Sequence, residues 1–228
     1  LGAVSSFFYG TIQSALFTLL AVYATSMNFT ILEISVVTFL LAVSGAVAQF
    51  PIGKLSDVYD RRKVIVISTF GASIFAILAI LVSRQMYLPD GLATSKTWFY
   101  IFFILFSFCS LPMFSLILAH TNDNISKDKF VAAGAGLQFI FGLGAMSGPF
   151  LCSVFMDLVG SNGFFIFLFF FHAIIGFFGI YRMTVRKTVE NPDSQFVAMP
   201  QTITPAGIEL NPTTEPIEEP EKNIESKI

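Results

Sequence analysis

Six charged side chains cluster at residues 53–63 of the 228-residue chain, between two long apolar runs. Asp57 stands among basic residues there, and a carboxylate at the end of an apolar run needs a partner. We expect that partner to be Arg61, Arg62 or the positive N-terminal end of another helix. Gly53 has no side chain, so a neighbouring helix can approach it closely. The alternative is that these basic residues only follow the general excess of positive charge on cytoplasmic loops.

Several polar side chains lie inside apolar runs, where burial without a partner is costly, and four of them are candidates for function. Tyr9 and Gln13, one helical turn apart, and Gln138 are candidates to line a solute path. Their alternative role is hydrogen bonding between helices, worth under about 1 kcal/mol each. His172 is the only ionisable side chain in the middle of such a run, which makes it a candidate proton site. The alternative is a neutral, hydrogen-bonded histidine.

A third group, Gly144, Gly148 and Pro149, affects the backbone. Pro149 lacks an N–H, so the carbonyl of Ala145 loses its usual helical partner and the helix should bend there. The two glycines lie four residues apart on one helix face, where they allow close approach of another helix. Ordinary packing of small residues is the alternative interpretation.

The sequence gives no support to several other kinds of site. Cys109 and Cys152 each lie in an apolar run without CxxC spacing, so we expect buried thiols and neither a disulfide nor a metal site. No HExxH, GxSxG or paired intramembrane aspartate occurs, so no enzyme and no cofactor are predicted. No basic patch interleaved with aromatic residues is present, which argues against nucleic-acid binding.

The elements that position these residues are membrane-spanning helices. Hydrophobic residues make up 54% of the chain, charged residues 12%, and mean hydropathy is +0.74, whereas a soluble domain is about one quarter charged. A bilayer core needs about 20 apolar helical residues. Six windows free of Asp, Glu, Lys and Arg meet that length: 1–32, 34–53, 64–83, 97–122, 130–156 and 158–181. The sequence therefore predicts an all-α polytopic membrane protein with six transmembrane helices.

Charge also divides the chain and orients it. Residues 1–187 carry 11 Lys and Arg against 7 Asp and Glu, and we expect them to form the six-helix bundle. Nine of these basic residues fall in alternate connections, which places both ends of the bundle in the cytoplasm. Residues 188–228 carry 2 basic and 8 acidic residues with six prolines, which predicts a disordered acidic cytoplasmic tail.

The sequence at 53–62 resembles the G-x-L-a-D-r-x-G-R-r signature that joins the second and third helices in each half of major facilitator superfamily transporters. Val58 stands where a basic residue is usual and Asp60 where a glycine is usual, as in the weaker second copy of the motif. The resemblance implies a gating charge cluster, which steadies one state of an alternating-access cycle, made by Gly53, Asp57, Arg61 and Arg62.

Further segments at 21–24, 49–53, 119–123 and 142–149, and the tail around 196–212, are similar to the bacterial YcaD-like permeases of that superfamily. The resemblance implies that the chain is helices seven to twelve of a twelve-helix secondary transporter in the plasma membrane, a bacterial inner membrane, with the first six helices missing. It further implies a small-molecule solute and a coupling proton as partners. It makes 144–149 a pivot and places the helices of Tyr9, Gln13 and Gln138 around the cavity. A self-contained six-helix receptor or channel subunit is the alternative.

Overall fold

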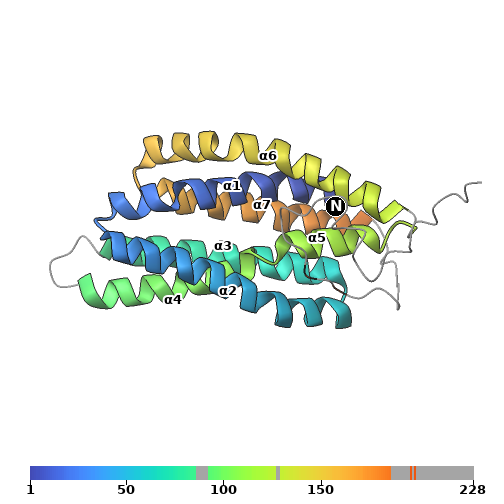
Figure 1. Ribbon diagram of the computed structural model, residues 1–228, viewed down its shortest axis with the longest axis horizontal. Helices are drawn as coiled ribbons and strands as arrows, with labels where there is room; N and C mark the ends of the chain where they lie inside the picture. Colours follow the sequence, from blue (N-terminus) through green and yellow to red (C-terminus); the bar gives the residue numbers. More distant parts are fainter. Residues whose placement is uncertain (86–91, 127–128, 186–195, 197, 199–228) are drawn as a thin grey trace, which may run out of the picture.

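The computed structural model describes residues 1–228 except 86–91, 127–128, 186–195, 197 and 199–228. The regular elements in the described part are long α-helices that lie side by side along the long axis of the molecule (Figure 1). Their bounds are α1 Gly2–Ser26, α2 Ile31–Val58, α3 Arg61–Gln85, α4 Leu92–Ser110, α5 Met113–Asn122, α6 Phe130–Val159 and α7 Gly163–Val185.

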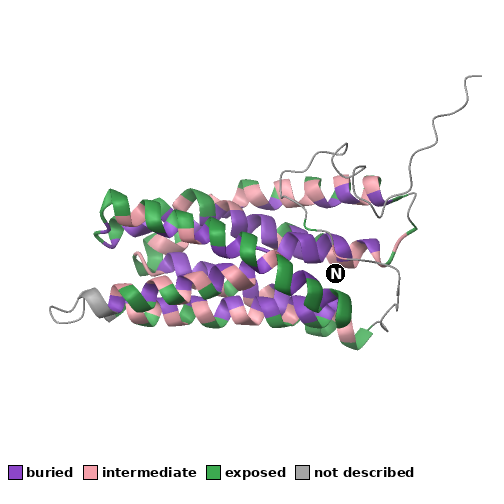
Figure 2. Ribbon diagram, turned by 60° about the horizontal axis from the view of Figure 1, so that its bottom comes forward, coloured by how far each residue is buried: buried purple, intermediate pink, exposed green. Residues whose placement is uncertain are grey.

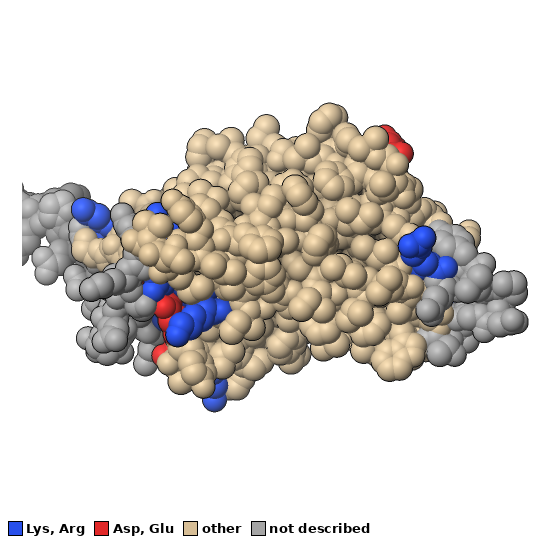
Figure 3. Space-filling view, turned by 180° about the vertical axis from the view of Figure 1, so that it is seen from behind, with Lys and Arg blue, Asp and Glu red and all other residues tan. Residues whose placement is uncertain are grey.

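Six helical segments are long and apolar enough to cross a membrane, and α4 and α5 together make the fourth of them. The visible Lys, Arg, Asp and Glu side chains gather at the two ends of the molecule and leave an uncharged belt between them (Figure 3). This separation suits a bilayer, whose hydrocarbon core is about 30 Å thick. The prediction of an all-α, six-span membrane protein is confirmed.

The fourth span differs from the single continuous helix that its apolar window predicts. It is broken at Leu111 and Pro112, between the end of α4 and the start of α5. Proline has no N–H to donate to the preceding turn, so the helical ladder is interrupted there. The hydroxyl of Tyr9 in α1 donates a hydrogen bond to the Leu111 carbonyl at 3.1 Å. A neighbouring helix thus satisfies a backbone group at the break, as non-helical backbone inside a membrane requires.

The connection at 53–63 is also shorter than the eleven residues that the sequence suggests. Helix α2 runs to Val58 and α3 begins at Arg61, so Tyr59 and Asp60 alone join them. The amide of Tyr59 still donates to the Leu55 carbonyl at 2.9 Å. Helix α2 extends beyond the apolar window 34–53 because its backbone hydrogen bonds do not require apolar side chains. Gly53 and Asp57 therefore lie on α2 rather than in a loop.

Helix α1 packs against α6 with their backbones in contact (Figure 1). A Cβ atom added at Gly144 would collide with the carbonyl oxygen of Phe7, and one added at Gly148 with that of Thr11. The Thr11 hydroxyl lies 3.1 Å from the Gly144 carbonyl oxygen and donates to it. Small residues and a hydroxyl are the usual means of close helix contact inside a membrane. The two helices therefore form one tightly joined pair.

Aromatic rings fill the interior between α1, α4 and α7. The ring of Tyr23 stacks on Phe99 and Phe164, with ring centroids 6.1 and 5.1 Å apart. Phe103 and Phe106 continue the stack along α4, and all of these rings are buried. Exposed residues instead lie on the outward faces of the helices (Figure 2). Part of the large phenylalanine content therefore builds the core, because stacked and edge-on rings pack favourably.

The predicted tail, 188–228, lies outside the described residues apart from Phe196 and Ala198. Helix α7 ends at Val185, close to the predicted end of the bundle at residue 187.

Candidate functional site

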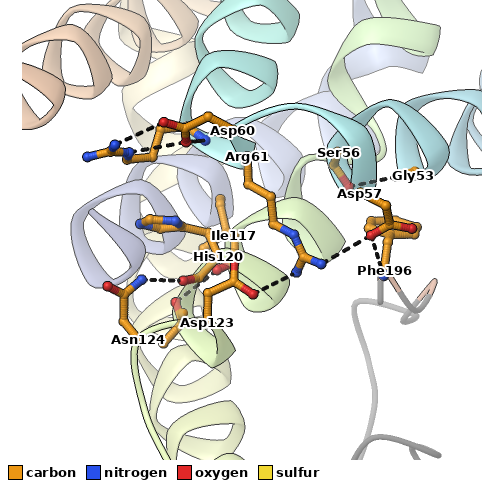
Figure 4. Close-up of polar contacts among 12 residues, drawn as sticks. Gly53, Ser56, Asp57, Asp60, Arg61, Ile117, His120, Asp123, Asn124 and Phe196 are labelled. Atoms are coloured by element: carbon orange, nitrogen blue, oxygen red, sulfur yellow. Dashed lines mark hydrogen bonds and ion pairs between the residues drawn. The ribbon is translucent and has the colours of Figure 1, made fainter. Parts of the chain in front are cut away.

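The centre of the candidate site is the guanidinium group of Arg61, the first residue of α3 (Figure 4). Its Nη2 lies 3.1 Å from Oδ1 of Asp57 on α2, and its Nη1 lies 3.3 Å from Oδ1 of Asp123 at the end of α5. The Arg61 side chain is only 6% exposed. A charge so little hydrated depends on its carboxylate partners. One arginine therefore links the ends of three helices.

Asp57 occupies an electrostatically unfavourable place that its partners offset. It stands in the last turn of α2, where the helix dipole presents negative partial charge. Besides Arg61, the backbone N–H of Phe196 donates a hydrogen bond to the same Oδ1 atom, at 2.7 Å. The carboxylate keeps about a third of its surface exposed, at 34%. Of the two kinds of partner predicted for Asp57, a following arginine is present among the described residues, and the backbone of Phe196 is added to it.

Asp60 and Arg62 form a second ion pair. Oδ1 of Asp60 accepts a hydrogen bond from the backbone N–H of Arg62 at 2.9 Å, so Asp60 caps the start of α3. Its carboxylate also binds the Arg62 guanidinium, at 2.9 Å from Nη2 and 3.2 Å from Nε. The aspartate that replaces the usual glycine of the motif thus neutralises Arg62 and starts the next helix. Arg62 pairs with Asp60, and Arg61 pairs with Asp57.

Gly53 lies one turn before Asp57 on α2, and its neighbour differs from the one we expected. The predicted neighbour was another helix, whereas the group packed on Gly53 among the described residues is the ring of Phe196 (Figure 4). A Cβ atom at position 53 would occupy the place of that ring. The carbonyl of Gly53 accepts a hydrogen bond from the Ser56 hydroxyl at 2.7 Å. The absence of a side chain at 53 therefore makes room for an aromatic ring.

Asp123 and Phe196 were not among the residues predicted for this site. Asp123 is the first acidic residue after the fourth apolar window, on the side of the membrane where the basic residues concentrate. That position was a usable signal, because a carboxylate beside a cluster of cations is a natural partner. Phe196 gave no such signal, since it lies 139 residues from Asp57 along the chain.

His172 lies in the bundle interior with both ring nitrogens in hydrogen bonds. Its Nδ1 is 2.7 Å from the Leu168 carbonyl oxygen and its Nε2 is 2.9 Å from the Ser110 hydroxyl. A carbonyl oxygen only accepts, so Nδ1 carries the proton and, in the neutral ring, Nε2 accepts from Ser110. The side chain is fully buried, and the ring of Phe106 packs edge-on against it. This geometry matches the neutral, hydrogen-bonded alternative.

The three candidates for a solute path lie on the facing helices α1 and α6. Tyr9 and Gln13 are almost completely buried, at 0% and 3% exposure. Gln138 on α6 is partly exposed, and its Oε1 atom is buried without a hydrogen-bond partner among the described residues. The ring of Tyr9 packs on Phe141, one turn beyond Gln138. Tyr9 and Gln138 therefore lie near one another along the same interface.

The third predicted group, Gly144, Gly148 and Pro149, lies in and just beyond the middle of α6. The helix continues through Pro149 to Val159. Gly144 and Gly148 face α1 at the backbone contact described above. The bend expected at Pro149 stays a prediction.

Comparison with known proteins places the chain among transporters. The sequence model of the Major Facilitator Superfamily matches residues 2–214. The chain is 26% identical over 190 residues to an uncharacterized MFS-type transporter, YE1530, of Yersinia enterocolitica, covering 83% of this chain and 44% of that protein. It is 26% identical over 168 residues to the uncharacterized MFS-type transporter YfkF of Bacillus subtilis, covering 72% and 39%. The chain thus spans less than half the length of these relatives. No solved structure matches it.

Proposed function

Because the chain belongs to the major facilitator superfamily of membrane transporters, we propose that it is the C-terminal six-helix half of a secondary transporter that moves a small solute by alternating access. The relatives are more than twice as long as the segment they share with this chain, which supports a transporter completed by a further six helices. The bacterial relatives also support a location in the inner membrane, with both ends of the bundle cytoplasmic as the distribution of basic residues favours.

The observation that carries the proposal is the position of Arg61 between Asp57 and Asp123. These contacts join the ends of α2, α3 and α5. If α2 and α5 move apart at this end, Arg61 loses a carboxylate while it is still poorly hydrated. Removing one partner of a buried ion pair costs about 3–5 kcal/mol, and less where one partner is partly exposed, as Asp57 is. The cluster therefore stabilises the conformation in which these ends are together.

The tight contact of α6 with α1 determines what can move. Since added side-chain atoms at Gly144 and Gly148 would meet α1 backbone, we expect α1 and α6 to move as a pair. The pivot then lies at Pro149, where the helix lacks one backbone hydrogen bond. In this scheme Tyr9, Gln13 and Gln138 line the solute path on the α1 side of the bundle.

A coupling proton has one candidate site in the described spans. No Asp or Glu occurs in the middle of an apolar window, and His172 is the mid-span ionisable group. Its Nε2 atom, which accepts from Ser110 in the neutral ring, is where a proton would bind. If transport is proton-coupled, we propose that either His172 or a carboxylate of the remaining half carries the proton.

The test compares Asp57→Ala and Arg61→Ala with Arg84→Ala in cells that express the native gene. Arg84 lies at the opposite end of α3 and is exposed, so its loss removes the same charge without touching the cluster. Solutes that accumulate or disappear on expression are first identified by mass spectrometry, and their flux is then measured in membrane vesicles. We expect both cluster variants to slow flux about tenfold or more at unchanged membrane abundance, with Arg84→Ala close to wild type.

Flux at the wild-type rate in both cluster variants would rule out the gating role. Binding of a solute without flux would instead favour a receptor, and ion current a channel subunit. The intact mass of the native product tests the twelve-helix part of the proposal separately, because six further apolar spans must precede or accompany this chain.

A further inference from the structure

We infer that Gly53 and Asp57 form a docking site for the C-terminal part of this same chain, with Phe196 as the residue that the site receives. Phe196 follows the last transmembrane helix, which ends at Val185, yet it returns to the end of α2 (Figure 4). Its half-buried side chain packs against the hydrophobic core. The inference rests on the proposed function, since it assigns regulation to the same charge cluster.

Two independent contacts define the docking site. The Phe196 ring lies on the side-chain-free surface of Gly53. Its backbone N–H donates to Oδ1 of Asp57 at 2.7 Å, and hydrogen bonds to an ionised acceptor are stronger than neutral ones. The first contact selects a flat apolar side chain, and the second fixes the backbone. A glycine at 53 and a carboxylate at 57 are both needed for this combination.

Phe196 and Arg61 bind the same carboxylate oxygen of Asp57. Oδ1 of Asp57 binds Phe196 N at 2.7 Å and Arg61 Nη2 at 3.1 Å. A second donor keeps the Asp57 carboxylate oriented while Arg61 bridges to Asp123. Phe196 thus holds Asp57 in the position from which it binds Arg61, and loss of Phe196 should loosen the charge cluster.

The charge of the segment that contains Phe196 fits this placement. Residues 188–228 carry 8 acidic and 2 basic residues. The neighbouring ends of α2 and α3 carry the exposed basic residues Lys54 and Lys63, besides Arg61 and Arg62 with their carboxylate partners. Opposite charges attract within a Debye length of about 8 Å at physiological salt, so this charge distribution favours the docked position of Phe196. The specific contacts at Gly53 and Asp57 then select Phe196.

Hydrogen exchange measured by mass spectrometry on the purified product of the native gene in lipid nanodiscs tests the docking without any substrate. In wild type we expect the peptide that contains the Phe196 amide to exchange about tenfold more slowly than the same peptide free in solution. Gly53→Val, which fills the place of the ring, should remove that protection. Gly136→Val is the matched control, because a Cβ at position 136 of α6 meets nothing within 4 Å. Equal exchange of the Phe196 peptide in wild type and Gly53→Val would overturn the docking.

A second set of variants tests the effect on the gate. Phe196→Ala and a chain that stops after Val185 should both speed exchange in the last turn of α2 and the start of α3, residues 53–63, about threefold or more. A chain that stops after Pro200 keeps Phe196 and should match wild type. Unchanged exchange at 53–63 in Phe196→Ala would overturn the regulatory part. These readouts do not involve transport, so they fail or succeed independently of the proposed function.

Discussion

Replacing Gly144 by alanine should destabilise the protein, whereas the same change two residues earlier, at Gly142, should not. Both glycines lie in the middle of α6. A Cβ atom at position 144 would overlap the carbonyl oxygen of Phe7 and lie 3.1 Å from the backbone nitrogen of Thr11. A Cβ atom at position 142 meets nothing within 4 Å. The pair thus isolates the α1–α6 contact from the general effect of alanine in a helix.

The size of the effect follows from two opposing contributions. Overpacking costs about 1–3 kcal/mol, and the upper part of that range applies because the obstructing atoms are backbone of a packed helix. Alanine gains up to about 1 kcal/mol over glycine inside a helix. Gly144→Ala should therefore lose about 2 kcal/mol, which lowers Tm by about 4–8 °C for a chain of this size. Gly142→Ala keeps only the gain, so its Tm should stay constant or rise by up to about 4 °C.

Thermal unfolding in one detergent, followed by circular dichroism and by the fraction of protein that stays monodisperse, measures both variants against wild type. Gly136→Ala is a second control, because position 136 also has open space. If Gly144→Ala and Gly142→Ala shift Tm equally, α1 and α6 do not touch through their backbones, and their motion as a pair is refuted. A fall in Tm for all three variants would show that small residues are required along the whole of α6.

Two further substitutions test contacts that stabilise the site and the core. Asp60→Ala removes the cap of α3 and a carboxylate of the buried Arg62, so Tm should fall by the equivalent of at least about 1 kcal/mol, whereas Asp60→Asn, which retains the cap, should lose less. Ser110→Ala leaves Nε2 of His172 without its hydroxyl and should cost about 1–3 kcal/mol, against under about 0.5 kcal/mol for Ser153→Ala, whose hydroxyl bonds within its own helix. Imidazole ¹⁵N chemical shifts should report a proton on Nδ1 in wild type, and a proton on Nε2 alone would contradict the assigned hydrogen bonds.

The membrane spans could be predicted from the sequence because the bilayer imposes a length and a polarity that each segment must meet alone. Residues 34–53 and 64–83 could each be predicted as a helix from their own sequence, without information about the neighbouring helices. Their ends were less predictable. An apolar window ends at the first charged residue, whereas α2 continues to Val58 because its backbone hydrogen bonds continue. The break at Pro112 could have been predicted from the proline, which has no N–H. A search for apolar windows alone does not detect it, because proline carries no charge.

The contacts of the candidate site also fall into a part that the sequence predicts and a part that it does not. The pairing of Asp57 with Arg61 was predictable because the two residues are only four apart in the chain, and the sequence motif that contains them is equally short. The addition of Asp123 and Phe196 was not, because both depend on how distant helix ends meet in space. The same holds for His172, whose hydrogen bond from Ser110 crosses between α7 and α4.

The sequence by itself determined the six apolar spans, the division of charge between bundle and tail, and the local part of the charge cluster, because each is fixed by residues close together in the chain. Only the tertiary structure decided which of several glycines are packed and which are open. Gly142 and Gly144 have similar neighbours in sequence, yet one has open space at its Cβ position and the other touches the backbone of α1. The direction in which a helical residue faces depends on the rotation of its helix against the others, and that rotation is set by the packing of all the helices together.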